Sequence, residues 1–263
     1  MPDRKTALIT GASFGIGLEL ARIFAREGHD LVLVARSGDK LRQLAAELEK
    51  NYNARSLILA ADLTDPGACA YILDQTTRAS LEVEILANNA GFGQYGMFAE
   101  SDLEDCLRQI QLNVTALTHL TRLYLPEMVG RKSGRILNVA STAAFQPGPL
   151  MAVYFATKAY VLHFSEALAN ELSGTGVTVT CLCPGATATE FHKRANASQM
   201  NLLKMGSMDA RTVAEDGYRA LMSGKPVVIS GFKNWLVAQS VRFSPRKMVT
   251  AIARNLQESK SPE

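Results

Sequence analysis

The chain has 263 residues, of which 47% are hydrophobic and 20% are charged, with a formal net charge of +3. This length and composition fit one large α/β domain. The charge is too small and too dispersed for nucleic acid binding, which favours small molecules or proteins as partners. The sequence has no apolar run of about 20 residues, and its first residues lack the apolar core of a signal peptide, so we expect a cytoplasmic protein.

The four cysteines are scattered along the chain in helix-like or strand-like contexts. The one close pair, Cys181 and Cys183, is expected to place its two thiols on opposite faces of a strand. We therefore expect neither a disulfide nor a metal site and interpret all four as reduced thiols of the core: Cys69, Cys106, Cys181 and Cys183.

A glycine-rich turn follows the first β-prone run, residues 6–10, and leads into a helical pattern. The turn contains Gly11, Gly15 and Gly17, with Ser13 and Ile16 between them. Three glycines allow a tight turn and a close approach of a pyrophosphate, which would meet free N–H groups at the start of the helix. The pattern predicts dinucleotide binding, although its spacing departs from the commoner G-x-G-x-x-G.

The second strand, residues 30–35, ends at Arg36. Folds of this kind hold the adenosine ribose at this point, and NAD-specific sites usually have a carboxylate there. A guanidinium instead suits a 2′-phosphate, because it forms charge-assisted, bidentate bonds. The pattern therefore favours NADP(H), with the Ser13 hydroxyl as a further contact. The alternative interpretation is a solvated arginine at a strand end.

Further strands are expected at residues 56–61, 83–87, 135–140 and 227–230, with helices between strands. This alternation predicts a parallel sheet covered by helices on both faces, with functional polar groups at the carboxyl ends of the strands. Asp62, followed by Leu63, and Asn89 lie at two such ends. Position alone does not decide between a cofactor contact and a helix cap or turn.

A helix expected from Leu103 to about residue 124 carries apolar residues at three- and four-residue steps. Asn113 falls on or beside that apolar face, where an unpaired amide would cost about 1–3 kcal/mol. It must therefore have partners, which are either backbone and water or a catalytic relay.

The residues that predict catalysis lie between Ser141 and Lys158. Ser141 follows a strand, and Tyr154 and Lys158 lie one turn apart in a helix expected over residues 153–172. A hydroxyl, a phenol and an ammonium can then meet at one strand end, an arrangement suited to proton transfer. The ammonium, helped by the positive ring of an oxidised nicotinamide cofactor, is expected to lower the pKa of Tyr154 toward neutrality. The alternative is an ordinary exposed helix pair.

With these residues the chain resembles the short-chain dehydrogenases/reductases over residues 6–191 and the strand at 227–230. The motifs that carry the resemblance match the family in chain order, and the glycine spacing is the family's own form of the turn. They are Thr10-Gly11 with Gly15-Ile16-Gly17, Asn88-Asn89-Ala90-Gly91, Asn113, Ser141, Tyr154 with Lys158, and Pro184-Gly185.

The resemblance implies an α/β fold: a single Rossmann-like, doubly wound parallel sheet of about seven strands over residues 1–231. After this domain the chain departs from simple members of the family, and its own pattern predicts a helical extension over residues 232–263, packed on or beside the same domain. It implies an NADP(H)-dependent oxidoreductase that interconverts carbonyls and alcohols. Tyr154 would be the general acid/base and Ser141 would orient the substrate oxygen. Lys158 would hold the nicotinamide ribose, and Asn113 would support a water relay.

The implied cofactor contacts extend along the carboxyl ends of the strands. Thr189 matches the family threonine that contacts the nicotinamide carboxamide, but Thr187 is a close rival. The full set is Gly11, Ser13, Gly15, Ile16, Gly17, Arg36, Asp62, Leu63, Asn89, Ala90, Gly91, Tyr154, Lys158, Pro184, Gly185, Thr187 and Thr189.

In the family, the substrate cavity is lined by loops that correspond here to residues 92–98, 143–146 and 186–208. Aromatic, methionine and small residues dominate these loops, with Gln94 and Gln146 as polar anchors, so an apolar ketone or aldehyde is expected. Four apolar residues in the last loop form either a lid or plain packing: Met200, Leu202, Leu203 and Met205.

Partners and alternative functions also follow. A homodimer or homotetramer is implied, through the helices that start near Leu103 and Val153. One alternative function is a non-catalytic NADP(H)-sensing protein, and another is a membrane-associated acyl or lipid ketone reductase.

The tail after residue 230 combines apolar residues at helical spacing with Lys233, Arg242, Arg246, Lys247 and Arg254. A basic amphipathic tail can lie on an anionic membrane or cover a neighbouring subunit. The apolar faces are short, so the sequence favours helices folded back over their own domain, with membrane contact as the less favoured interpretation.

Overall fold

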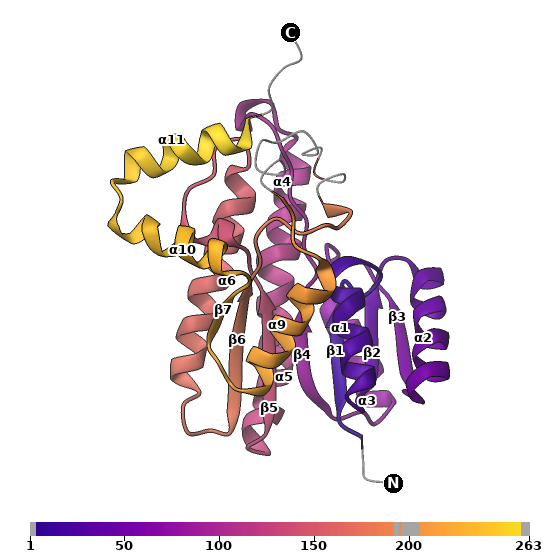
Figure 1. Ribbon diagram of the computed structural model, residues 1–263. Helices are drawn as coiled ribbons and strands as arrows, with labels where there is room; N and C mark the ends of the chain where they lie inside the picture. The colour runs from indigo at the N-terminus through magenta and orange to yellow at the C-terminus, as the bar shows by residue number, and fades with distance from the viewer. Residues whose placement is uncertain (1–3, 192–194, 196–205, 259–263) are drawn as a thin grey trace.

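The structure, a computed structural model, describes residues 4–191, 195 and 206–258. Seven parallel strands form one sheet in the order β3-β2-β1-β4-β5-β6-β7 (Figure 1). This confirms the predicted fold class, and the bounds of the six strands placed in the sequence agree with expectation to within one residue, whereas β6 had no predicted bounds. The strands are β1 (Thr6–Thr10), β2 (Asp30–Ala35), β3 (Ser56–Ala60), β4 (Val83–Asn88), β5 (Gly134–Val139), β6 (Val177–Cys183) and β7 (Val227–Ile229).

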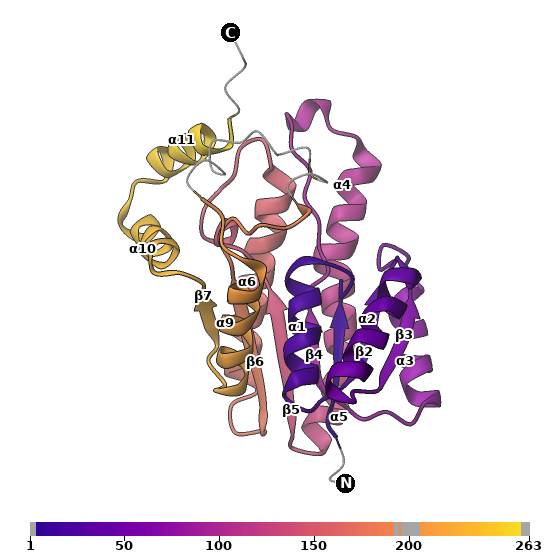
Figure 2. The same cartoon turned by 45° about the vertical axis from the view of Figure 1, so that its right-hand side comes forward.

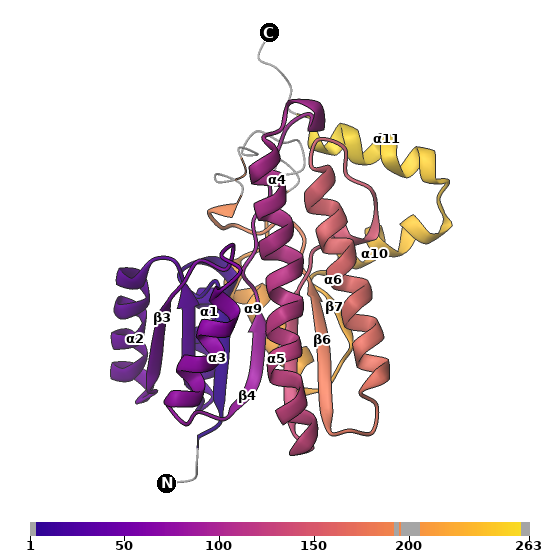
Figure 3. The same cartoon turned by 180° about the vertical axis from the view of Figure 1, so that it is seen from behind.

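Helices cover both faces of the sheet, which is why the central strands are buried along their whole length. One face packs against α1 (Gly15–Arg26), α2 (Gly38–Tyr52) and α9 (Ala210–Met222), as Figure 2 shows. The other face packs against α3 (Ala68–Arg78), α5 (Leu117–Gly130) and α6 (Ala152–Glu171), seen from behind in Figure 3.

The strand order reverses between β1 and β4. The chain builds the sheet outward from β1 to β3, then returns to β4 and builds outward to β7. The loops that leave β1 and β4 therefore diverge to opposite faces, and a crevice opens at the carboxyl ends of the strands. Ser141, Tyr154 and Lys158 all line the cavity at this edge of the sheet.

The helix expected from Leu103 is one long rod of three parts: α4 (Leu103–Ile110), a π-helical segment η2 (Gln111–Ala116) and α5. Its apolar face is buried within the chain only in the second half. Leu117 and Leu120 are buried, but Leu103, Leu107 and Ile110 are 69%, 50% and 40% exposed. The periodic pattern identifies an apolar face without showing whether the covering surface belongs to the same chain.

The two close cysteines lie on the same face of β6, with Sγ atoms 3.8 Å apart. The expectation of opposite faces was wrong, because residues two apart in a strand point to the same side. Both thiols are fully buried and free, as are Cys69 and Cys106.

The C-terminal extension comprises α10 (Phe232–Ser240), the 3₁₀ turn η4 (Val241–Phe243) and α11 (Arg246–Gln257). It folds back to the carboxyl end of the sheet beside β7 and α6 and forms an outer edge of the molecule (Figure 1). Its inward-facing residues Ala238, Val249, Ala253 and Gln257 are buried. Within the described ranges, no helix combines the length and the apolar character needed to cross a bilayer.

Candidate active site

The glycine turn after β1 requires glycine at Gly11 and Gly15, which have φ angles of +69° and +59°. Gly11 N donates to Val34 O at 2.8 Å, which fixes the turn against β2. At Gly17 a Cβ would lie 2.3 Å from Gly11 O, so only glycine lets the start of α1 approach the turn. A side chain at Gly11 or Gly17 would collide with Asn89 or with the turn itself, so the two glycines allow the backbone to form the cradle.

Asn89 holds this cradle from the neighbouring strand end. Its Nδ2 donates to Thr10 O at 2.8 Å, and Thr10 Oγ1 in turn accepts from the backbone N–H groups of Asn89 and Ala90. Position in the sequence did not decide between a structural and a cofactor role. The structure gives Asn89 the structural role and places it in the wall of the cavity as well.

A cavity of about 1450 Å³ runs along the carboxyl ends of the strands, from Arg36 to α10 and α11. Every predicted cofactor-binding residue lines the cavity except Gly17, which instead packs against Gly11 within the turn. Of the predicted substrate loops, Gln94 and Gln146 line the cavity. Tyr95, Met97 and Phe98 do not, which corrects that part of the prediction. The lid candidates Met200, Leu202, Leu203 and Met205 lie outside the described residues.

At the outer end of the cavity, Arg36 and Arg108 both approach Asp62 Oδ2, at 3.9 Å and 3.8 Å. Burial alone would raise the pKa of Asp62, but hydrogen bonds from Thr64 and the two guanidiniums outweigh it, and the pKa lies below its ordinary value. Asp62 is therefore ionised at neutral pH. Arg36 keeps 63% of its side chain exposed at the cavity wall, so most of its hydrogen-bonding capacity is available to a ligand.

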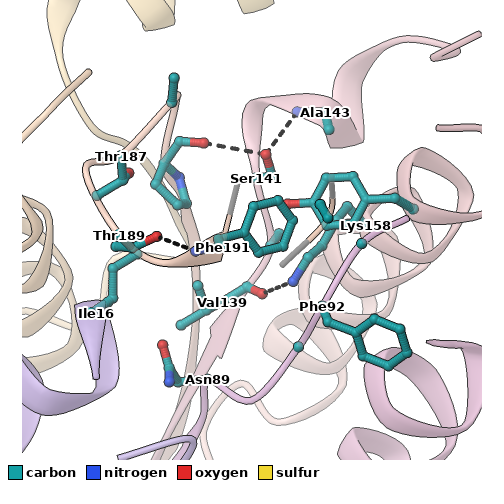
Figure 4. A pocket seen from close by; sticks show the side chains of 18 of the residues that line it. Ile16, Asn89, Phe92, Val139, Ser141, Ala143, Lys158, Thr187, Thr189 and Phe191 are labelled. Atoms are coloured by element: carbon teal, nitrogen blue, oxygen red, sulfur yellow. Dashed lines mark hydrogen bonds between the residues drawn. The ribbon is translucent and has the colours of Figure 1, made fainter. Parts of the chain in front are cut away.

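The two candidate threonines differ in what they face. Thr187 is buried and donates to Gly185 O at 3.0 Å. Thr189 accepts from Phe191 N at 3.2 Å, and its Cγ2 lies 2.9 Å from where a Cβ on Gly15 would be. Thr189 thus faces the glycine turn across the cavity, next to Ile16 (Figure 4).

Asn113 lies in the π-helical segment and has partners for both ends of its amide. Its Oδ1 accepts from Phe92 N at 3.1 Å, and its Nδ2 donates to Phe92 O at 2.9 Å and to Thr157 Oγ1 at 3.0 Å. These bonds connect the helix to the loop after β4 and to α6. The amide oxygen keeps one further lone pair, which the predicted water relay would use.

Ser141 caps the 3₁₀ turn η3 (Thr142–Phe145). Its Oγ accepts from Ala143 N at 3.1 Å and donates to Pro184 O at 3.4 Å (Figure 4). The first bond fixes the oxygen at the cavity wall. The second is long for an O–H donor, so little is lost when this hydrogen turns toward a substrate oxygen.

Lys158 is 5% exposed, and its Nζ donates to Val139 O at 2.8 Å. Burial lowers its pKa to about 8, although the neighbouring Cys181 and Cys183 act in the opposite direction. Gly91 lies beside the ammonium, and a Cβ there would be in ordinary contact with Nζ at 3.4 Å and in closer contact with Asn113 Oδ1 at 3.1 Å. The bond to Val139 O holds the cation at the inner end of the cavity.

Tyr154 lies beside these two residues, with its ring centroid 5.8 Å from Lys158 Nζ. Burial raises the pKa of the phenol to about 12, and the hydrogen bond with Ser141 offsets this only in part. Without the oxidised nicotinamide that the expectation included, Lys158 does not bring this pKa near neutrality. Removing the phenolate from water costs more free energy than the Lys158 ammonium returns, because this ammonium lies over the ring and donates its hydrogen bond to the carbonyl of Val139.

Phe191 packs against Tyr154 with ring centroids 5.2 Å apart, and the loop after β4 closes on both rings at Gly93. A Cβ at Gly93 would lie 2.9 Å from Phe191 Cζ and 3.0 Å from Tyr154 Cδ2. Together with Met151 these residues form the apolar surround that desolvates the phenol.

Several wall residues had no signal in the sequence that singled them out. Arg108 on α4 reaches Asp62 from a distant part of the chain, and Phe191 reaches Tyr154 from a separate loop. The inner faces of α10 and α11 also line the cavity, which the amphipathic pattern of the tail could have suggested. The residues concerned are Val237, Ala238, Ala253, Leu256 and Gln257.

The cradle, the exposed Arg36 guanidinium and the buried Lys158 ammonium fit a phosphorylated nicotinamide dinucleotide. The glycine turn would take the pyrophosphate at the start of α1, Arg36 would face the adenosine ribose, and Lys158 would face the nicotinamide ribose. A parallel, doubly wound sheet with a nucleotide cradle and a serine, tyrosine and lysine at one cavity defines a nicotinamide-dependent oxidoreductase.

The chain belongs to the short-chain dehydrogenase family, whose sequence model matches residues 5–200. Members of this family oxidise CH–OH groups or reduce C=O groups with NAD(P)(H).

Among its relatives, the very-long-chain 3-oxoacyl-CoA reductase of Bos taurus is 34% identical over 192 residues, 71% of this chain and 61% of the relative. The chain thus spans about three fifths of the length of several curated relatives it matches. A short-chain dehydrogenase from Sphingobium yanoikuyae, solved with NADPH, is 36% identical with a TM-score of 0.80, covering 91% of this chain and 94% of the other. A bulky-bulky ketone specific alcohol dehydrogenase from Comamonas testosteroni is 33% identical with a TM-score of 0.77, covering 91% and 92%.

Proposed function

We propose that the protein is an NADP(H)-dependent reductase of bulky, apolar ketones or aldehydes. One observation carries this proposal: Tyr154 and Ser141 meet where the cofactor half of the cavity joins an apolar half lined by Met151, Phe155 and Phe191. A substrate carbonyl placed there has a proton donor and a second hydroxyl beside its oxygen. The whole cavity of about 1450 Å³ exceeds the usual range of ligand pockets, which is consistent with a cavity that holds a dinucleotide and a substrate together.

The pKa of Tyr154 sets its role in reduction. With a pKa of about 12 the phenol is fully protonated at neutral pH, so it can donate its proton to the carbonyl oxygen as negative charge builds there. When bound, NADPH supplies the hydride that the carbonyl carbon accepts. Ser141 Oγ would turn its hydrogen from Pro184 O to the same oxygen and stabilise the developing alkoxide.

The preference for the phosphorylated cofactor rests on Arg36. No carboxylate occupies the end of β2, and the exposed guanidinium of Arg36 is held only loosely by Asp62, at 3.9 Å. Replacing Arg36 with Ala should reduce the preference for NADPH over NADH at least tenfold, measured as a ratio of kcat/KM values. Arg78→Ala, on the exposed surface of α3, serves as the control. An unchanged ratio in Arg36→Ala would refute the 2′-phosphate assignment.

The reaction is tested with a panel of bulky ketones, aldehydes and 3-oxoacyl thioesters, following NADPH absorbance. We expect turnover of the bulky apolar members and a loss of at least a hundredfold in Tyr154→Phe. Tyr160→Phe is the matched control, because it removes an exposed hydroxyl from the same helix. Tight NADPH binding without turnover of any member would instead support a sensing role.

A further inference from the structure

The C-terminal extension has a second, outward side that packs on nothing among the described residues. Phe243 is 89% exposed and Phe232 is 76% exposed, and Trp235, the only tryptophan of the chain, stacks on Phe232 with ring centroids 5.9 Å apart. Leu236 and Ile252 are also more than half exposed. We call this outward side of α10, η4 and α11 the C-terminal surface.

Cations accompany these apolar side chains. Lys233, Arg242, Arg246 and Lys247 are exposed, and none of them has an ion-pair partner in the part of the chain that the structure describes. The stretch from 232 to 258 contains one acidic residue, Glu258, which pairs with Arg254 at 2.8 Å. The C-terminal surface is therefore apolar and strongly positive at once, although the whole chain carries only +3.

The other side of the same helices is a wall of the cavity. Phe232, Lys233 and Val237 are both exposed to solvent and part of the cavity lining. The rim of the cavity therefore lies at the C-terminal surface. Whatever covers this surface meets the entrance used by an apolar substrate.

The positive charge of the C-terminal surface decides which kind of partner can cover it. A second copy related by a two-fold axis would bring the same unpaired cations against each other, which is repulsive. An anionic bilayer satisfies both properties: its interface takes up exposed aromatic and aliphatic side chains, and its headgroups attract lysine and arginine. Tryptophan and phenylalanine next to basic residues are typical of helices that lie in this interface.

We propose that the C-terminal surface docks on an anionic lipid bilayer, with α10 and α11 lying in the interface and the cavity rim facing the lipid. Apolar substrates would then enter from the bilayer without crossing water. This inference goes beyond the reductase proposal and does not depend on it, because binding to lipid is measured without turnover.

The test uses the full chain and vesicles of phosphatidylcholine with or without phosphatidylglycerol. We expect flotation with the anionic vesicles only, weakened by high salt because the charge attraction is screened. Trp235 should shift its emission to the blue on binding and be quenched by lipids brominated on their acyl chains. Since the chain has one tryptophan, this signal reports the C-terminal surface alone.

Two variants and two controls separate this docking from unspecific adhesion. Phe243→Ser should weaken binding about tenfold, and Arg242→Glu with Lys247→Glu at least about 20-fold. Neither change touches the cavity lining, so reduction of a soluble substrate should be unaffected. Tyr71→Ser and the pair Lys50→Glu with Lys225→Glu make the same kinds of change elsewhere and should bind like the unaltered chain.

Three outcomes would overturn the proposal. The first is no flotation with anionic vesicles. The second is flotation without a blue shift or quenching of Trp235, which would place the lipid contact elsewhere. The third is a change of oligomeric state in Phe243→Ser with unchanged vesicle binding, which would make the C-terminal surface an interface between copies.

Discussion

Tyr154 shows how burial decides the resting state of a catalytic group. The ring is surrounded by Phe155, Phe191 and Met151, and this surround raises the pKa of the phenol to about 12. A protonated phenol is the form needed to reduce a carbonyl, whereas alcohol oxidation needs the phenolate. The ligand-free site is therefore set for reduction.

The state of Tyr154 can be measured directly from phenolate absorbance near 295 nm. In the cofactor-free protein, the pH titrations of the unaltered chain and of Tyr154→Phe should coincide from pH 7 to about 9.5, because a pKa of about 12 leaves the phenol protonated throughout. Saturation with NADP⁺ should bring an ionisation into that range, since the positive nicotinamide favours the phenolate. A phenolate below pH 9 without cofactor would contradict the structure.

Lys158 should make cofactor binding depend on pH. Burial lowers its pKa to about 8, so the free protein loses this positive charge as the pH rises through 8. The dissociation constant of NADPH should be constant from pH 6 to 7.5 and then increase by up to tenfold per pH unit. Lys158→Met should bind weakly at every pH and lack the break near pH 8. Fluorescence titration of NADPH measures both, and a break that persists in Lys158→Met would assign it to another group.

At the residue scale, the spacing in the sequence predicted which residues form the site better than it predicted their pKa values and orientations. Ser141, Tyr154 and Lys158 come from one strand end and one helix, so their meeting follows from local structure. The pKa of Tyr154 depends on Phe191 and Met151, which approach from elsewhere in the chain, and Lys158 is turned by the carbonyl of Val139. Such contacts depend on tertiary packing that no spacing in the sequence encodes.

Among the elements, the rod from α4 to α5 carries the most information about the site. Its π-helical segment places Asn113 so that three hydrogen bonds connect it to Phe92 and Thr157. π-helical turns are rare and occur mostly at functional sites. The segment aligns the loop after β4 with the helix that carries Tyr154.

Removing the Asn113 amide should lower the stability of the protein and also loosen the loop after β4 relative to α6. Asn113→Ala leaves buried partners unpaired, so the free energy of unfolding should fall by about 2 kcal/mol in urea titrations. Reduction should slow because Phe92 and α6 lose their common anchor. Thr115→Ala, an exposed change in the same segment, should leave the stability within about 0.5 kcal/mol. Equal stability of the two variants would show that these bonds contribute little.

At the element scale, periodicity predicted every strand it placed, because strands buried on both faces read as continuous apolar runs. It did not predict the break in the helix at Gln111–Ala116, since a π-helical turn changes hydrogen bonding without changing composition. It also could not assign the partner of Leu103 and Leu107, because an interface and a core have the same apolar pattern.

The whole molecule presents two separate apolar surfaces. One is the C-terminal surface, which is positive. The other lies on α4 and α6, where Leu103, Leu107, Ile110 and Tyr160 are at least 39% exposed. The second surface lacks a comparable group of unpaired cations, so it can face a copy of itself across a two-fold axis. The two surfaces should therefore have different partners.

We predict that α4 and α6 mediate a homodimer. Leu103→Glu combined with Leu107→Glu should raise the dimer dissociation constant at least about 100-fold, because two leucines lose their burial and two carboxylates would be desolvated. Sedimentation velocity over a range of protein concentrations measures this change. Met222→Glu, an exposed apolar site on α9, is the control. Phe243→Ser should leave the dimer intact, because Phe243 lies on the C-terminal surface and not on α4 or α6. A monomeric unaltered chain at micromolar concentration would refute the prediction.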